Sequence, residues 1–244
     1  MEQSVQLLSD LRALASAPSS LTARRTKLGR AAAETQTKMR HAREWETITL
    51  DGSVLFLSSQ FELTVRDMAD SFVTAVAARF RRYADLPQGL RDENVRLIGI
   101  LLQDTTRAQV AHVNSAQIIQ ELAQCLHKGS PVKLFSVGFA LHERNMTSGM
   151  LAELFKRAEV RDLWRDIAKA AQVRAYFGNL NVDRTAELAK AKLNAFMEQR
   201  NQIAHRGPNY QTVGDTVVLD YIAFFRCIVP ALADVLEGRL KAYL

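Results

Sequence analysis

The chain has 244 residues, 48% of them hydrophobic, so it is long enough to bury the core of one large domain or two small ones. Its 11 glycines and 5 prolines are few for this length, which favours helices over the turn-rich composition of β-sandwiches and barrels. We therefore predict an all-α helical bundle and exclude an all-β fold.

The residue pattern does not predict export or membrane insertion. No apolar run approaches the roughly 18 uncharged residues that a membrane span requires, and the N-terminal residues lack the basic start and apolar segment of a signal peptide. Cys125 and Cys227 lie far apart within apolar helical patterns, which predicts two reduced, buried thiols. We expect a soluble cytoplasmic protein with no metal or other cofactor.

The net charge of +6 is concentrated near the N-terminus. Between Leu21 and Arg43, seven basic residues stand against Glu34 alone, which gives seven minus one, or +6. Such a segment can bind an anionic polymer such as RNA through counterion release, or it can be a solvated helical face. The candidate RNA contacts in this segment are Arg24, Arg25, Lys27 and Arg30.

Helical patterns then follow one another along the chain. Two helices over residues 4–17 and 21–44 form a predicted basic arm (1–44), which would dimerise or widen an RNA-binding surface, ahead of one helical domain (45–244). Asp51 is a predicted N-cap, and the apolar spacing after it predicts a long core helix that ends before Pro87. Shorter helices are predicted over 92–104, over 115–127, from Ser148 onward and over 161–177.

Two long helices are predicted in the last quarter of the chain. The first begins at Asp183 or Thr185 and ends within a residue or two of His205, because the Gly-Pro pair that follows stops a helix. The second covers about 215 to 240 and should bend at Pro230.

Arg200 and His205, at the end of the first of these helices, form an R-x4-H pattern. Arginine keeps its charge and can clamp a phosphate, whereas histidine titrates near neutral pH and can transfer a proton. The partial negative charge of a helix C-terminus favours a protonated imidazole, which can act as a general acid. Arg107 and His112 have the same spacing, but no helix stop follows them, so the context favours the first pair.

The helical angles show that this motif is half a site. Positions five apart differ by about 140° around a helix, so Arg200 and His205 do not share a face, whereas Asn201 nearly shares one with His205. We expect Asn201 to hydrogen-bond the imidazole and orient it. Because one histidine cannot be base and acid at once, a second copy across a two-fold axis would complete the site.

The chain resembles the HEPN superfamily of helical nucleases, and in particular the RiboL-PSP-HEPN-like branch found in bacterial toxin and defence proteins. RNQIAHRG (200–207) is similar to that family's R-N-x-x-A-H-G signature. HERNMTSGMLAELFKRAEV (142–160) is similar to its Asn-Met stretch before a short helix, and VLFLSSQFELTVRDM (54–68) is similar to its first core helix. Together the resemblance covers residues 50 to 240 in the right order.

The resemblance implies a metal-independent endoribonuclease that acts as a homodimer, in which a ribose 2′-hydroxyl attacks the adjacent phosphorus and leaves a 2′,3′-cyclic phosphate. Carried over residue by residue, Arg200 and His205 are the catalytic pair and Asn201 is the polar residue beside them. Glu62 occupies the acidic position of the first core helix and is a candidate substrate contact. Arg206 departs from the signature because it precedes the glycine, where it would contact a phosphate or crowd the site.

Two functions from different classes stay open at this point. In the first, the protein is a ribonuclease toxin or anti-phage effector whose partners are RNA (tRNA or mRNA), a second copy of itself, and a cognate antitoxin or regulatory protein. In the second, it is a non-catalytic helical dimer that binds RNA, a nucleotide or a partner protein. RNA cleavage that depends on His205 would separate the two.

Overall fold

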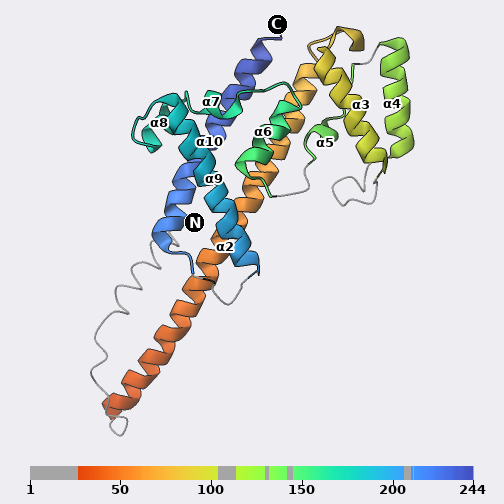
Figure 1. The fold of residues 1–244 in the computed structure, drawn as a ribbon. Coiled ribbons are helices and arrows are strands. Elements are labelled where there is room, and N and C mark those ends of the chain that lie inside the picture. Colours follow the sequence, from red (N-terminus) through yellow and green to blue (C-terminus); the bar gives the residue numbers. More distant parts are fainter. Residues whose placement is uncertain are drawn as a thin grey trace. The chain divides into compact units, whose positions relative to one another are not determined.

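The computed structural model of this chain describes residues 27–103, 114–129, 132–141, 145–205, 210 and 212–243. These residues form helices joined by loops, and no β-strand occurs in them (Figure 1). The predicted all-α fold is confirmed. Several helices also begin or end close to the predicted positions.

The helices fall into two compact units. The first unit contains the residues up to Ser59 together with Glu198–Phe224, and the second contains Gln60–Met197 together with Phe225–Leu244. The helices are α2 (Lys27–Ala77), the 3-10 turn η1 (Tyr83–Asp85), α3 (Gln88–Gln103), α4 (Ser115–Lys128), α5 (Ser136–Phe139), α6 (Ser148–Lys156), α7 (Leu163–Ile167), α8 (Ala171–Tyr176), α9 (Val182–His205) and α10 (Asp215–Lys241).

The first unit draws its core from three helices that also contribute to the second. Leu50 and Val54 of α2, Ile203 of α9 and Val218 of α10 are at most 2% exposed. The spacing of Leu50 and Val54, four residues apart, keeps both on one face of α2. Burying one such aliphatic side chain stabilises a fold by about 1.5–3 kcal/mol. The burial of Ile203 therefore holds the last turn of α9 in the first unit.

An aromatic cluster joins three helices in the core of the second unit. The ring of Phe225 from α10 lies 4.8 Å from the ring of Phe61 on α2 and 4.8 Å from that of Phe196 on α9, measured between centroids. The contact with Phe196 is edge-on, the geometry that aromatic pairs prefer. Phe225 therefore packs α2, α9 and α10 together within this unit.

A buried asparagine connects α3 to the segment after α4. The side chain of Asn94, 1% exposed, donates to the hydroxyl of Tyr83 over 3.1 Å and accepts from the backbone N–H of Phe135 over 2.7 Å. Gly129, with a positive φ of 70°, ends α4 in the left-handed conformation that glycine tolerates. Buried polar groups must be paired to avoid a desolvation penalty, so Asn94 fixes this corner of the second unit.

The predicted helix from Ser148 is confirmed as α6, although its N-cap is Thr147. The backbone of Ser148 connects two further helices, because its N–H donates to Asn194 Oδ1 of α9 over 2.9 Å and its carbonyl accepts from Trp164 Nε1 of α7 over 2.9 Å. Met146, just before this helix, is completely buried. The Asn-Met stretch thus packs into the second unit.

Two helix predictions are wrong. Asp51 is not an N-cap, because α2 continues without a break through this position. The helix predicted over 161–177 is two short helices, α7 and α8, separated by Ala170 in an extended conformation. Ile167 and Val173, on the two sides of this break, are both fully buried, although on one continuous helix they would point about 120° apart.

Helix α10 is long and apolar enough to cross a membrane by length and composition, the one such helix in the part of the chain that the structure describes. Half of its most apolar stretch is buried within this protein. Pro230 lies inside the helix and is exposed. The burial of half of this stretch is also what a helix in the core of a folded domain shows.

Candidate functional site

The R-x4-H motif occupies the last turns of α9, and His205 is the final helical residue. The predicted helix end is therefore confirmed. Ile203 is 2% exposed and anchors this turn, whereas Gln202 and His205 are exposed and Arg200 is half-buried. The arrangement presents a histidine to solvent at the carbonyl end of a long helix.

Arg200 is positioned by its neighbour in the sequence. Its Nη1 donates to Oδ1 of half-buried Asn201 over 3.3 Å. One edge of the guanidinium is thereby held beside the helix, and a guanidinium has five N–H donors in all. The sequence predicts that Asn201 orients His205, and that role stays a prediction. The contact with Arg200 is an addition that the helical angles did not suggest.

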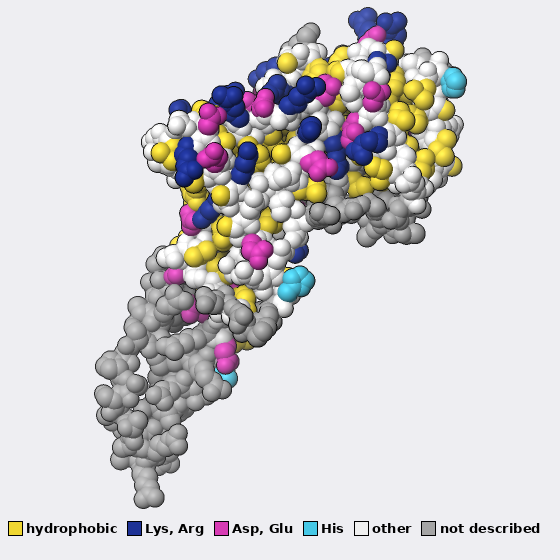
Figure 2. All heavy atoms as spheres, in the orientation of Figure 1, with side chains coloured by type: hydrophobic (Ala, Val, Ile, Leu, Met, Phe, Trp, Pro, Cys, Tyr) yellow, Lys and Arg dark blue, Asp and Glu magenta, His cyan; other side chains and the backbone are white. Residues whose placement is uncertain are grey.

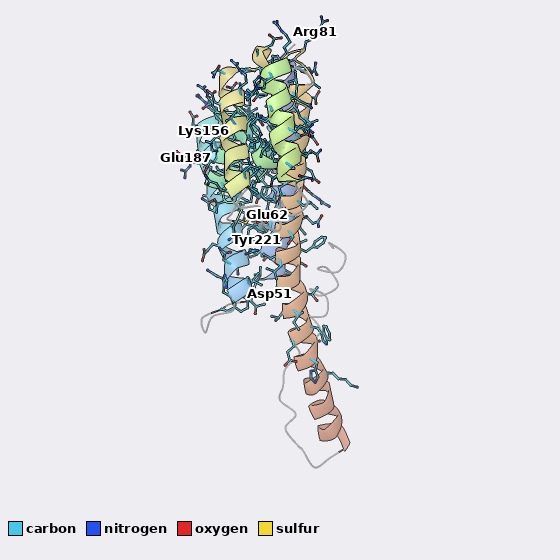
Figure 3. All side chains as sticks on the ribbon, turned by 90° about the vertical axis from the view of Figure 1, so that its right-hand side faces the viewer. Asp51, Glu62, Arg81, Lys156, Glu187 and Tyr221 are labelled. Carbon is cyan, nitrogen blue, oxygen red and sulfur yellow. The ribbon has the colours of Figure 1, made fainter. Side chains whose placement is uncertain are left out.

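The loop that follows His205 is tied back to α2 within the first unit. The hydroxyl of Tyr210 donates a hydrogen bond to Oδ1 of Asp51, a carboxyl that is 1% exposed. Figure 3 shows Asp51 on the side of α2 toward the C-terminal helices. Val213, a few residues further on, is 4% exposed. Tyr210 and Val213 are therefore both held within the first unit.

Sequence reasoning missed this tether. Asp51 stands between Leu50 and Val54 on a face of α2 that is otherwise buried, and Glu46 on the same helix is 7% exposed. The signal that could have identified the contact is an acidic residue, Asp51, at a position where the helical spacing of Leu50 and Val54 predicts a buried face. A buried carboxyl requires a hydrogen-bond partner. The competing reading of Asp51 as an N-cap concealed that signal.

Glu62 lies on α2 in the second unit, whereas Arg200 and His205 belong to the first. Its Oε1 is buried and accepts no hydrogen bond from the residues that the structure describes. A buried carboxyl oxygen without a donor is unusual in a folded protein. The role of Glu62 as a substrate contact stays a prediction.

The side chains of the remaining candidates lie outside what the structure describes. Arg206 follows the end of α9, and Arg107 and His112 fall between α3 and α4. In the basic arm, Arg24 and Arg25 precede α2, while Lys27 and Arg30 are placed in its first turns by their backbone alone. On the face shown in Figure 2, Lys and Arg alternate with Asp and Glu over the described surface. The role of Arg206 and of the basic arm in binding RNA stays a prediction.

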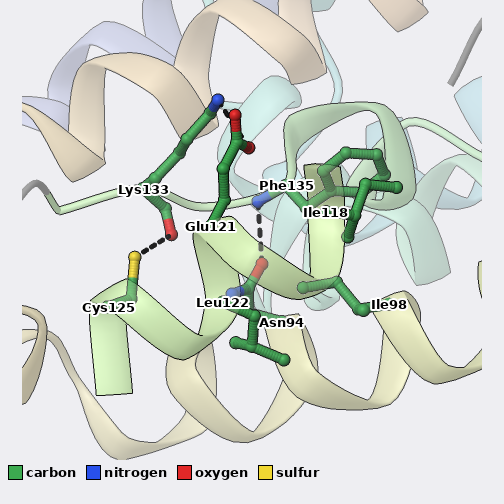
Figure 4. Close-up of a pocket in the computed structure, with 8 residues that line it drawn as sticks. All are labelled: Asn94, Ile98, Ile118, Glu121, Leu122, Cys125, Lys133 and Phe135. Atoms are coloured by element: carbon green, nitrogen blue, oxygen red, sulfur yellow. Dashed lines mark hydrogen bonds and ion pairs between the residues drawn. The ribbon is translucent and has the colours of Figure 1, made fainter. Parts of the chain in front are cut away.

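A hollow lies between α3 and α4, with an empty volume of about 230 Å³ (Figure 4). Lys133 and Glu121 form an ion pair of 2.6 Å at its edge, and Cys125 contributes a buried thiol. The hollow contains neither the histidine nor the arginine of the motif. The end of α9 is therefore the better candidate for chemistry on a phosphate.

Comparison with known proteins identifies the family. The model of the RiboL-PSP-HEPN family matches residues 32–238, which include α3 to α9 and most of α2 and α10. The chain belongs to the RiboL-PSP-HEPN family. Searches of curated proteins and of solved structures found no match. Family membership indicates a nuclease-type or RNA-related function.

Proposed function

We propose that this protein is a metal-independent endoribonuclease whose site is completed by two copies of the R-x4-H motif. The observation that carries the proposal is the placement of exposed His205 at the end of α9, with Arg200 five residues before it and hydrogen-bonded to Asn201. Membership in the RiboL-PSP-HEPN family supports it, since that family contains nucleases.

The chemistry requires one proton acceptor and one proton donor. One His205 removes the proton from the ribose 2′-hydroxyl, whose oxygen then forms a bond to the adjacent phosphorus. The bond from phosphorus to the 5′ oxygen breaks, and His205 of the second copy donates a proton to that leaving oxygen. The products are a 2′,3′-cyclic phosphate and a 5′-hydroxyl. Arg200 stabilises the negative charge that develops on the phosphoryl oxygens.

The cellular setting follows as part of the same proposal. Cutting tRNA or mRNA in the cytoplasm would arrest growth, which suits a toxin or an anti-phage effector held in check by an antitoxin or a regulatory protein. Unpaired RNA loops are the expected substrates, because their bases and riboses are accessible. Growth arrest on expression should then be lost with His205→Ala.

The direct test is cleavage of single-stranded RNA by the purified protein in EDTA, with the ends of the products mapped. His205→Ala and Arg200→Ala should each reduce the rate by at least about 100-fold, the range expected for general acid–base and oxyanion groups. Matched controls are His127→Ala and Arg174→Ala, which alter exposed residues elsewhere and should leave the rate unchanged. RNA binding without cyclic-phosphate ends at any protein concentration would instead establish the non-catalytic alternative.

A further inference from the structure

The first unit has an outward face on α2 that is apolar although it is exposed. The side chains of Trp45, Ile48 and Phe56 are 68%, 51% and 57% exposed. With Gly52, also exposed, they fall within about 80° of arc on a helix. We call these four residues the outer stripe. Clustered apolar side chains on a surface indicate that something else covers them.

The outer stripe lacks the charges that a nucleic acid would require. From Thr47 to Ser59 the only charged residue is Asp51, and it is 1% exposed on another side of the helix. RNA binds mainly through contacts of Lys and Arg with its phosphates. The hydroxyl groups of Thr49, Ser53 and Ser59 already donate to carbonyls of α2, so covering them removes no partner. The stripe therefore fits an apolar, uncharged occupant.

The chain contains such an occupant in its first residues, which lie outside the described part. The sequence predicts a helix over residues 4–17, in which the only two charges, Asp10 and Arg12, cancel. Three leucines at helical spacing fall within about 60° of arc on this helix, and neither charge lies among them: Leu7, Leu11 and Leu14. A helix with one such apolar face requires a surface to cover it.

The length of the connecting chain allows this segment to reach the outer stripe. Ten residue steps, 27 minus 17, join Ala17 to Lys27 at the start of α2, and they span at most about 33–36 Å. Trp45 lies about 27 Å along the helix axis from Lys27. The segment can therefore turn back and lie antiparallel to α2. A short tether also gives it an effective concentration on the order of millimolar, which favours it over a separate molecule.

The apolar spacings of the two helices are mirror images. Positions 7, 11 and 14 are separated by four and then three residues, and positions 45, 48 and 52 of the stripe by three and then four. Side chains of antiparallel helices meet in reverse order, so one register satisfies all three positions. This register sets Leu14 against Trp45, Leu11 against Ile48 and Leu7 over Gly52.

Gly52 leaves room for the side chain that this register places over it. A Cβ built on Gly52 would meet nothing within 4 Å. Glycine weakens a helix relative to alanine, but it allows another group to approach the backbone closely. We propose that residues 4–17 form a helix that covers the outer stripe of the same chain, antiparallel to α2.

This proposal goes beyond the ribonuclease function and does not rest on it. It divides the basic arm into two parts with different roles. Residues 4–17 carry no net charge and close the first unit, whereas the basic residues between Leu21 and Arg43 remain as the part of the arm that can contact RNA.

Disulfide trapping tests the register. A chain with Leu11→Cys and Ile48→Cys should form an internal disulfide under mild oxidation, because the two side chains face each other. Leu14→Cys combined with Trp45→Cys should do the same. Ser9→Cys combined with Ile48→Cys is the matched control and should not, since Ser9 points about 160° away from Leu11 on the predicted helix.

Thiol reactivity tests whether the stripe is covered in the full chain. Ile48→Cys should react with Ellman's reagent many times more slowly than Gly149→Cys, because Gly149 is exposed, helical and free of neighbours at its Cβ. Adding Leu11→Asp should restore fast reaction at position 48, whereas adding Ser9→Asp should not. The two native cysteines are buried, and their continued lack of reaction would show that each variant is folded.

Each outcome supports or overturns the proposal. An internal disulfide together with slow reaction at position 48 supports it. A disulfide that joins two chains would overturn it and assign the outer stripe to a second copy. Fast reaction of Ile48→Cys would also overturn it, and slowing of that reaction only on addition of single-stranded RNA would assign the stripe to RNA. None of these measurements involves RNA cleavage, so failure of the ribonuclease function would leave the proposal intact.

Discussion

The hydroxyl of Tyr210 donates a hydrogen bond to the buried carboxyl of Asp51, although 159 positions separate the two residues in the sequence. This contact joins the loop after α9 to the middle of α2. It lies five residues beyond His205 and is the nearest described tether on that side of the candidate site. A contact close to the candidate site in sequence thus involves a residue far from the R-x4-H motif.

Removing this hydroxyl should weaken the first unit. Tyr210→Phe leaves the ring in place but deletes the donor to a buried carboxyl, and we expect the free energy of unfolding to fall by about 2 kcal/mol. Urea unfolding followed by circular dichroism measures the change. Tyr243→Phe, in the second unit with its ring against Phe80, should change the free energy by less than about 0.5 kcal/mol. Equal stability of Tyr210→Phe and wild type would show that the hydroxyl contact contributes nothing.

The hydrogen bonds of Asn94 predict that replacing this residue, in the second unit, lowers the free energy of unfolding by more than Tyr210→Phe does. Asn94→Leu removes the acceptor of the Phe135 N–H and the donor to Tyr83, both in a buried setting. We expect about 3 kcal/mol of destabilisation, because buried polar groups lose their partners. The measurement is the urea midpoint, compared with Val95→Leu at the adjacent exposed position. A midpoint equal to that of the control would contradict the role assigned to Asn94.

An ion pair joins Asp166 of α7 to Arg239 of α10, and it predicts that the stability of the fold depends on pH. Burial tends to raise the pKa of Asp166, but hydrogen bonds from Lys169 and Arg239, at 2.7 Å each, outweigh it and hold that pKa below its usual value. A carboxyl with a lowered folded pKa stabilises the fold above its unfolded pKa, near 3.9, and this contribution is lost as the pH falls through the folded pKa.

Asp166→Asn should therefore reduce stability by about 1 kcal/mol at neutral pH. The difference from wild type should stay constant down to about pH 5 and shrink below about pH 4. Urea unfolding across this range measures it, with Asp162→Asn as the control, since Asp162 is exposed and makes no side-chain cap to α7. A difference that grows as the pH falls would contradict the sign of the argument.

The thiol of Cys227 should be nearly unreactive in the folded protein. Burial raises its pKa to about 11, against smaller opposing effects of the backbone N–H groups of Cys227 and Ile228. At pH 8 only about one thiol in a thousand would then be ionised, and the thiolate is the reactive form. Ellman's reagent should label Cys227 only after unfolding in urea, whereas the exposed thiol of Gly149→Cys should react at once. Rapid labelling of Cys227 in the native wild type would show that the thiol is accessible.

The end of α9 could be predicted because its signals are local. A Gly-Pro pair such as Gly207-Pro208 strongly disfavours continuation of a helix, and His205 is the last helical residue in the structure. The same holds for Gly129, which ends α4 with a positive φ.

The break between α7 and α8 could not be predicted from the local sequence, because tertiary contacts impose it. Ala168, Lys169 and Ala170 are all good helix formers, yet the helix ends among them. The fold instead requires Ile167 and Val173 both to be fully buried, and the hydrogen bond from Arg239 of α10 holds the turn through Asp166. Tertiary packing outweighed local preference here, as it did when α2 continued through Asp51.

The first unit combines segments far apart in the sequence, since its residues come from Met1–Ser59 and from Glu198–Phe224. On the ribosome, α2 is made early and must wait for almost the entire remaining chain before Tyr210 can reach Asp51. Contacts between such distant residues form late and slowly. Assembly of the candidate site is therefore postponed until translation of the chain is nearly complete.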